Sequence, residues 1–223
     1  MREMQRVRDR AEQVRNKAVG VFRSGEPEAL ASFMRDTYAE LDRVIIEMLS
    51  EYPPPVQSSC RKGCWYCCHS YVSVSAPEAV YLAMGIKAWW SEDSRNWVDE
   101  QCTIRMFTGE SPGEVWQAAI VCPLLASGEC MAYSFRPFSC RGCNSLDGEA
   151  CKQAFYQGDA EREIFRYAPQ ARAASLYRQA LVAASSDAGL FASCMPHTTL
   201  LSEFINWQKP AGGWLSGYAP TFA

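Results

Sequence analysis

The chain has 223 residues, which is enough for one domain with a substantial core, with or without helical additions. Its net charge of −3 gives no reason to expect a nucleic-acid partner, and its 48% hydrophobic and 21% charged residues are ordinary for a globular protein. The charged start is unlike a signal peptide and no apolar run is long enough to span a bilayer, so we expect a cytoplasmic protein with no membrane partner.

Two long amphipathic helices are predicted for the first fifty residues. Apolar residues recur at steps of three and four between residues 3 and 23, and again from Pro27 to about residue 50. Gly25 and Pro27 separate the two runs, which therefore predict a helical hairpin. Residues 1–24 carry seven basic against three acidic side chains, which we interpret as a solvated helix face rather than a docking arm.

The rest of the chain predicts short elements around a region without periodicity. After the triple proline at 53–55, a short strand is expected at 71–75, followed by helices at about 77–89, 94–105 and 113–120, and by a helical region from residue 149 with breaks near Pro169, Gly189 and Pro196. Residues 121–148 contain turn signals and cysteines, so we expect this segment to need a crosslink to the rest of the chain. The tail from Gly212 is expected to be irregular.

These elements predict a mainly α fold with a helical hairpin and an irregular, cysteine-rich, metal-stapled module packed on helices. We divide the chain into the hairpin (1–52), the cysteine module (56–155) and C-terminal helices packed on the module (156–223). The hairpin contains no cysteine and precedes the proline linker, so we expect it to be an addition that the metal module does not need.

Eleven cysteines are the feature that indicates the class of protein. A reducing cytosol disfavours a disulfide framework, and an odd number of cysteines does not pair completely. The densest run is Cys60-x3-Cys64-x2-Cys67-Cys68, and such short spacings let a turn aim thiolates at one metal. Because neighbouring side chains in extended chain point to opposite faces, Cys67 and Cys68 suit two different metals and predict a second set of ligands elsewhere.

The second set is available between residues 122 and 151. The eight candidate metal ligands are Cys60, Cys64, Cys67, Cys68, Cys122, Cys130, Cys140 and Cys151. Eight thiolates suit two four-sulfur sites, or one site with supporting thiols. Cys143, three residues after Cys140, is an alternative to Cys151, whereas Cys102 and Cys194 lie in helical patterns and are expected to be small buried side chains.

The order of these motifs resembles the zinc- or iron-chelating cysteine-cluster family called YkgJ-like. The resemblance lies in the run Cys60–Cys68, the Cys122-Pro123-Leu124 element, Cys130, the segment Arg136-Pro137-Phe138-Ser139-Cys140-Arg141, Cys151, and the stretch 72–79. It covers about residues 60–155, and its first cysteine gap is three residues rather than the two typical of the family. The resemblance implies a metal site of zinc or an iron–sulfur cluster such as 4Fe–4S.

Two classes of function remain open. One is a metal-binding protein that sequesters, senses or is folded by its metal. The other is an iron–sulfur-dependent protein lysine N-methyltransferase-like enzyme, because flagellin lysine N-methylases carry a similar cysteine run. Residues 1–223 contain no GxGxxG, P-loop or HExxH motif, which favours the first class, and the sequence identifies no catalytic residue and no particular protein partner.

The residues around the cysteines have two interpretations each. His69 either completes a site or lies beside it, whereas His197 follows Pro196 without an obvious partner and is interpreted as structural. Trp65 and Tyr66 either shield a cluster from water or anchor a loop-rich segment. Arg136 and Arg141 flank Cys140 and either offset thiolate charge or form ordinary ion pairs.

Overall fold

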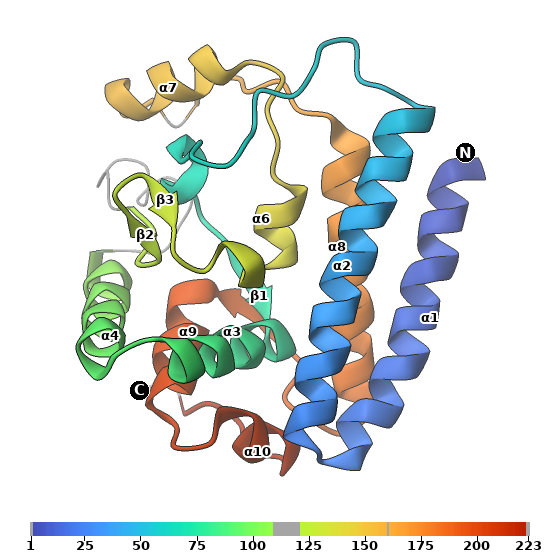
Figure 1. Ribbon diagram of the computed structural model, residues 1–223, viewed down its shortest axis with the longest axis vertical. Helices are drawn as coiled ribbons and strands as arrows, with labels where there is room; N and C mark the ends of the chain where they lie inside the picture. Colours follow the sequence, from blue (N-terminus) through green and yellow to red (C-terminus); the bar gives the residue numbers. More distant parts are fainter. Residues whose placement is uncertain (1, 109–120, 160, 222–223) are drawn as a thin grey trace.

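Helices dominate the computed structural model of the protein, which describes residues 2–108, 121–159 and 161–221 (Figure 1). The predicted mainly α class is confirmed. The α-helices are α1 (Arg2–Ser24), α2 (Pro27–Glu51), α3 (Ala76–Trp89), α4 (Glu92–Thr108), α6 (Phe138–Gly142), α7 (Gly148–Gln157), α8 (Ala168–Asp187), α9 (His197–Asn206) and α10 (Pro210–Leu215). The other elements are the 3₁₀ helices η1 (Tyr66–His69) and η2 (Tyr133–Phe135) and the strands β1 (Ser73–Ser75), β2 (Leu125–Ala126), β3 (Glu129–Cys130) and β4 (Cys194–Pro196).

Some expectations fall outside these ranges or need correction. The helix expected at 113–120 lies outside the described residues. The tail is not irregular from Gly212, because α10 continues to Leu215. The reason is tertiary burial: Trp214 is fully buried, its indole Nε1 donates to the Phe191 carbonyl at 3.1 Å, and its ring meets Phe22 edge-on at 5.0 Å. Across the described ranges, no helix has the length and hydrophobicity needed to cross a membrane.

The long helices α1, α2 and α8 run side by side (Figure 1). The buried side of α1 follows steps of four, three, four and four residues along Val7, Ala11, Val14, Ala18 and Phe22. Its main neighbour is α8, whose buried face is rich in alanine and lets the helices approach closely. The hairpin helices thus bury their apolar stripes within this chain.

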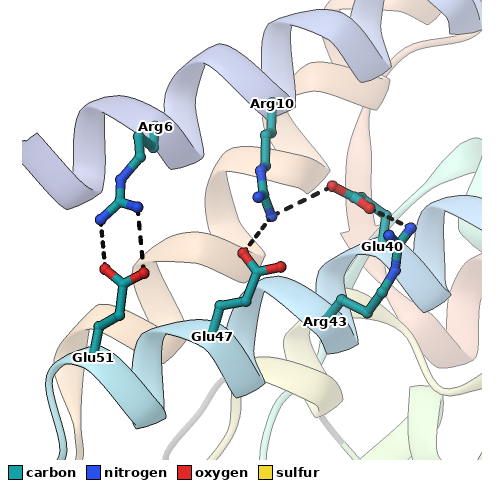
Figure 2. A network of polar contacts seen from close by, with 6 residues as sticks. All are labelled: Arg6, Arg10, Glu40, Arg43, Glu47 and Glu51. Atoms are coloured by element: carbon teal, nitrogen blue, oxygen red, sulfur yellow. Dashed lines mark hydrogen bonds and ion pairs between the residues drawn. The ribbon is translucent and has the colours of Figure 1, made fainter.

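Two basic side chains of α1 face acidic side chains on α2. Arg6 meets Glu51 with two nitrogens, at 2.6 and 3.3 Å, and Arg10 lies 2.8 Å from Glu47 and 3.7 Å from Glu40 (Figure 2). These pairs are exposed or partly exposed, so they contribute little to stability, but they link the two helices. This arrangement agrees with the interpretation of a solvated helix face.

A second group of helices lies below the cysteine-rich part in Figure 1. Helix α9 packs on α3 and α4, and α10 packs on α3 and α2. Strands β1 and β4 pair antiparallel, with Ser73 opposite Pro196 and Ser75 opposite Cys194. This short sheet joins the chain just after the first cysteine run to the chain just before α9.

The predicted boundary at residue 52 is crossed by several contacts. Asp42 of α2 binds the buried Arg141 of α6 at 2.6 Å, and the Tyr38 ring meets Phe138 edge-on at 4.9 Å. One hydrophobic core contains residues of the hairpin, the cysteine module and the C-terminal helices. The three-part division stays a prediction. Because of these contacts, we expect that removing residues 1–52 would disturb the position of α6.

Helix α6 lies against α8 only because its last residue is glycine. A Cβ atom at Gly142 would stand 2.5 Å from the Ala174 Cβ and 3.3 Å from the Ala171 Cα. Such a separation is far below van der Waals contact, so a side chain here forces α6 away from α8. Because α6 carries Cys140 and ends before Cys143, this close approach sets where both thiols lie.

We expect Gly142→Ala to destabilise the protein by about 1–3 kcal/mol, since the added methyl group overpacks a backbone contact. Gly20→Ala is the matched control, because nothing lies within 4 Å of a Cβ there and the change should stabilise the interior of α1 by roughly 0.5–1 kcal/mol. Urea denaturation measures both changes. Equal stabilities for the two variants would contradict the close packing of α6 on α8.

Candidate metal centre

The first cysteine run is held to the chain around residue 145 by backbone hydrogen bonds. The Ser59 nitrogen donates to the Ser145 carbonyl at 2.9 Å, and the Ser145 nitrogen donates to the Cys60 Sγ at 3.1 Å. The run then turns through η1, which contains Cys67 and Cys68. The start of this run is therefore fixed to the chain around residue 145.

The second group of cysteines begins beside the first. The Cys122 nitrogen donates to the Cys68 carbonyl, and the β2–β3 hairpin follows, with Leu125 opposite Cys130. Its two-residue turn has positive φ at both Ser127 (50°) and Gly128 (78°), as type I′ hairpin turns require. A Cβ at Gly128 would stand 3.4 Å from the Trp65 ring, so the turn lies on the first run.

Cys140 is positioned by the buried carboxyl group of Glu78. The Glu78 Oε1 accepts from the Phe138 nitrogen at 2.7 Å, at the start of α6. Its Oε2 accepts from the Ser75 backbone nitrogen at 2.9 Å, as part of a capping box on α3, and also from the Ser75 hydroxyl at 2.7 Å. One side chain thus joins the start of α3 to the start of α6. Burial raises the pKa of Glu78, and the hydrogen bonds from Ser75 and Phe138 oppose that rise.

The two arginines beside Cys140 have different surroundings. Arg141 is buried and points away from the cysteines: its guanidinium donates to Asp42 Oδ2 and to the Ser134 carbonyl, both at 2.6 Å, and lies over the Tyr38 ring. Arg136 lines the cysteine cavity described below and stacks on Tyr133 at 3.6 Å. Arg141 therefore forms a structural ion pair with Asp42. Of the two arginines, Arg136 is the one placed to offset the charge of thiolates in the cavity.

Helix α7 presents Cys151 and covers the first run. Asp147 caps it by accepting from the Glu149 and Ala150 nitrogens, both at 3.0 Å. Its Phe155 meets the rings of Trp65 at 4.8 Å, His69 at 4.8 Å and Tyr66 at 6.2 Å. The two aromatic residues of the cysteine run therefore anchor α7, and Trp65 also lines the larger cavity.

Nine cysteines surround two adjoining cavities. The larger cavity, about 140 Å³, is lined by Cys64, Cys67, Cys68, Cys122, Cys130, Cys140 and Cys143. The smaller cavity, about 30 Å³, is lined by Cys60, Cys64, Cys67, Cys143 and Cys151. All eight predicted ligands lie on one cavity or the other, and Cys143 lies on both together with Cys64 and Cys67.

The side chains of Cys67 and Cys68 point in different directions, but for a different reason from the one expected. The two residues lie in a 3₁₀ helix rather than in extended chain, so their side chains are separated by about 120° around the helix axis. Cys67 lines both cavities, whereas Cys68 lines only the larger one. The assumption of an extended backbone was wrong.

His197 has a partner that sequence reasoning missed. It is buried and lines the larger cavity, and its Nε2 lies 3.5 Å from the Cys122 Sγ. The His197 nitrogen donates to the Val72 carbonyl at 2.8 Å, so the pairing of β1 with β4 brings it here. Burial lowers the pKa of His197 to about 3, with a smaller contribution from Arg105. A neutral imidazole is a good metal ligand.

Burial raises the pKa of several cavity thiols. It is the largest cause for Cys60, for Cys122, whose pKa rises to about 11, and for Cys140. The hydrogen bond with Cys143 lowers the pKa of Cys67, but the bond with Cys68 and burial outweigh it and bring the value to about 12. Without metal, these groups are therefore protonated thiols at neutral pH.

The donor type fits zinc or an iron–sulfur cluster, because both are held by cysteine sulfur. The arrangement is not yet a closed site: within the described ranges, no three His, Cys, Asp or Glu side chains are grouped closely enough to hold a metal ion. To share one metal, thiols lining the cavities would have to reorient.

The remaining cysteines lie elsewhere. Cys102 is fully buried in α4, as expected. Cys194 is exposed in β4 rather than buried in a helix, because the pairing of β4 with β1 overrides the helical pattern. Neither residue lines the two cavities.

Comparison of the chain with models of protein families, with curated proteins and with solved structures finds no match. The evidence for function therefore comes from the sequence and from the geometry of the cysteine cavities.

We expect Glu78→Gln to destabilise the protein by about 1–3 kcal/mol, because all three groups that face the carboxyl are donors and an amide offers only one oxygen. The exposed Glu100→Gln in α4 is the control, and its effect should stay within about 0.5 kcal/mol. Urea denaturation measures both. A Glu78→Gln variant as stable as Glu100→Gln would show that Glu78 does not hold α3 and α6 together.

Proposed function

We propose that this protein binds metal through cysteine thiolates at two adjoining positions, one in each cysteine cavity. The observation that carries the proposal is the distribution of the cysteines. Seven line the larger cavity and five line the smaller, three of them shared, which makes nine of the eleven in the chain. Thiols that serve only as small core side chains have no reason to gather around two cavities. The same residues support membership of the YkgJ-like cysteine-cluster family.

The volumes of the cavities favour different occupants. At about 15 Å³ for each water-sized centre, the smaller cavity holds about two such centres and suits a single ion such as zinc. The larger cavity holds about nine and has room for an iron–sulfur cluster. Zinc would supply a structural crosslink, whereas an iron–sulfur cluster would also carry an electron.

Each cavity has its own candidate ligands besides the shared ones. Cys60 and Cys151 line only the smaller cavity. Cys68, Cys122, Cys130 and Cys140 line only the larger, where His197 adds a nitrogen donor next to Cys122. Because the thiols are not closed around a metal, binding would draw them together and crosslink the segment 121–148 to the first cysteine run. Metal binding and folding of the cysteine module are therefore coupled in this proposal.

The experiment is metal analysis of protein purified without oxygen, with four serine variants compared with the parent. Cys151→Ser should reduce the metal of the smaller cavity alone, Cys130→Ser that of the larger cavity alone, and Cys64→Ser should affect both and lower the melting temperature. Cys194→Ser is the control, because Cys194 is exposed and lies outside both cavities. A brown solution with broad visible absorbance indicates iron–sulfur, and a colourless one with stoichiometric zinc indicates a structural ion.

Two outcomes would contradict this proposal. One is a parent protein that holds neither zinc nor iron after anaerobic purification and after reconstitution with zinc or with iron and sulfide. The other is a Cys64→Ser variant that keeps all the metal of the parent and melts at the same temperature.

We also expect metal binding to weaken as the pH falls. The cavity thiols have raised pKa values, so each one that becomes a ligand releases a proton, and protons compete with the metal more strongly at lower pH. Zinc affinity should drop between about pH 8 and about pH 6, by roughly tenfold per pH unit for each proton released. Titration with zinc in weak buffer containing a pH indicator counts the protons, and binding without proton release would exclude thiolate ligation.

A further inference from the structure

A third cavity adjoins the two that the cysteines line. It measures about 280 Å³ and lies beside α6 and α8. Its lining residues are Ser70, Tyr71, Ser139, Gly142, Cys143, Arg166, Ala171, Ala174, Ser175 and Arg178. We call it the arginine cavity, because two arginines from different segments, Arg166 and Arg178, line it. It meets both cysteine cavities at Ser70 and Cys143.

One of the two arginines is held in place by its neighbours. The Arg178 Nη1 donates to the Ser139 hydroxyl at 2.7 Å and to the Ser73 carbonyl at 3.1 Å. The Ser139 hydroxyl in turn donates to the same carbonyl at 2.6 Å. These bonds use one nitrogen of the guanidinium and fix its plane, so the others keep a constant orientation at the cavity.

The other arginine, Arg166, is exposed and lies two residues before α8. It lines the arginine cavity and the smaller cysteine cavity. Within residues 2–108, 121–159 and 161–221, no carboxylate forms an ion pair with Arg166 or Arg178; the eleven ion pairs there involve other residues. The positive charge of Arg178 opposes the rise in pKa that burial causes at Glu78, but the Glu78 oxygens accept hydrogen bonds from Ser75 and Phe138 rather than from Arg178.

Hydroxyl groups complete the polar lining. The Ser175 Oγ accepts from the Gln179 Nε2 at 3.0 Å, so its own proton can be donated to a ligand. Tyr71 also lines the cavity. Two guanidinium groups with hydroxyl donors match the charge and the hydrogen-bond acceptors of a phosphate or carboxylate group. The volume corresponds to about nineteen water-sized centres, which is more than one oxyanion fills.

We propose that the arginine cavity binds a small molecule through its phosphate or carboxylate group, with the rest of the molecule lying toward the cysteine cavities. Arg166 and Arg178 hold the oxyanion, and Ser175 donates to it. The site does not require a metal, because all these donors come from the chain itself. A competing explanation is that the two arginines only neutralise charged metal thiolates, and the experiment separates the two.

The experiment measures the melting temperature of the purified full chain at increasing inorganic phosphate, with chloride keeping the ionic strength constant, and records the metal content of each sample. A ligand that binds only the folded state raises the melting temperature with concentration. We expect this for the parent and for Arg172→Gln, an exposed arginine of α8 outside the cavity. Arg166→Gln should weaken phosphate binding on the order of tenfold or more, since it removes a charge-assisted hydrogen bond.

Arg178→Gln should have the same effect, but it also breaks the bonds to Ser73 and Ser139, so Arg166→Gln is the decisive variant. Acetate in place of phosphate tests the carboxylate source: stabilisation by either anion that Arg166→Gln abolishes supports the site and identifies the group. No stabilisation by either anion, or equal stabilisation of the parent and Arg166→Gln, overturns it. Loss of metal from Arg166→Gln with unchanged anion binding also overturns it and favours charge neutralisation. Anion binding by a parent protein that takes up neither zinc nor iron on reconstitution would leave this site standing while contradicting the proposed metal function.

Discussion

The hydrogen bonds that Glu78 accepts decide where the cysteine-rich part of the chain can lie. Three donors from two segments, the nitrogen and hydroxyl of Ser75 and the nitrogen of Phe138, meet on one buried carboxyl group. Ser75 follows the first cysteine run, and Phe138 stands two residues before Cys140. A carboxyl in the core is unfavourable unless it is satisfied, so only an arrangement that brings both segments to Glu78 is stable. The two groups of cysteines are thereby brought to the same cavities.

Helix α6 depends entirely on such external contacts. It has five residues, far too few to be stable alone in water. Glu78 holds its start, Arg141 ties it to Asp42 of α2, and Gly142 lets it touch α8. Three neighbouring helices therefore position Cys140 and Cys143. This explains how a chain with few regular elements between residues 121 and 148 keeps a defined structure, and why the hairpin bears on the cysteine cavities although it contributes no cysteine to them.

The sequence predicted those features whose causes are local. The apolar steps along α1 and α2 gave both helices to within a residue or two, and the spacing of Cys60 to Cys68 identified the run that lines the cavities. His197 was missed as a cavity residue because it is brought beside Cys122 by the pairing of β1 with β4, and 75 residues separate the two in sequence. The prediction of an irregular tail was wrong because the burial of Trp214 depends on tertiary packing. The division of the cysteines between two cavities depends on the three-dimensional arrangement of the chain, so the spacing of cysteines along the sequence does not predict it.

The shared wall between the cysteine cavities has a consequence for how they could be occupied. Cys64, Cys67 and Cys143 line both, but four cysteines line the larger cavity alone, so a four-sulfur site there would leave the shared thiols to a metal in the smaller cavity. Nine cysteines exceed the eight that two four-sulfur sites require by one. If metal filled both cavities, the choice between Cys143 and Cys151 would be a choice of which thiol is surplus. His197 adds a nitrogen donor next to Cys122, so the larger cavity has donors enough of its own, and filling it would not draw a shared cysteine away from the smaller one.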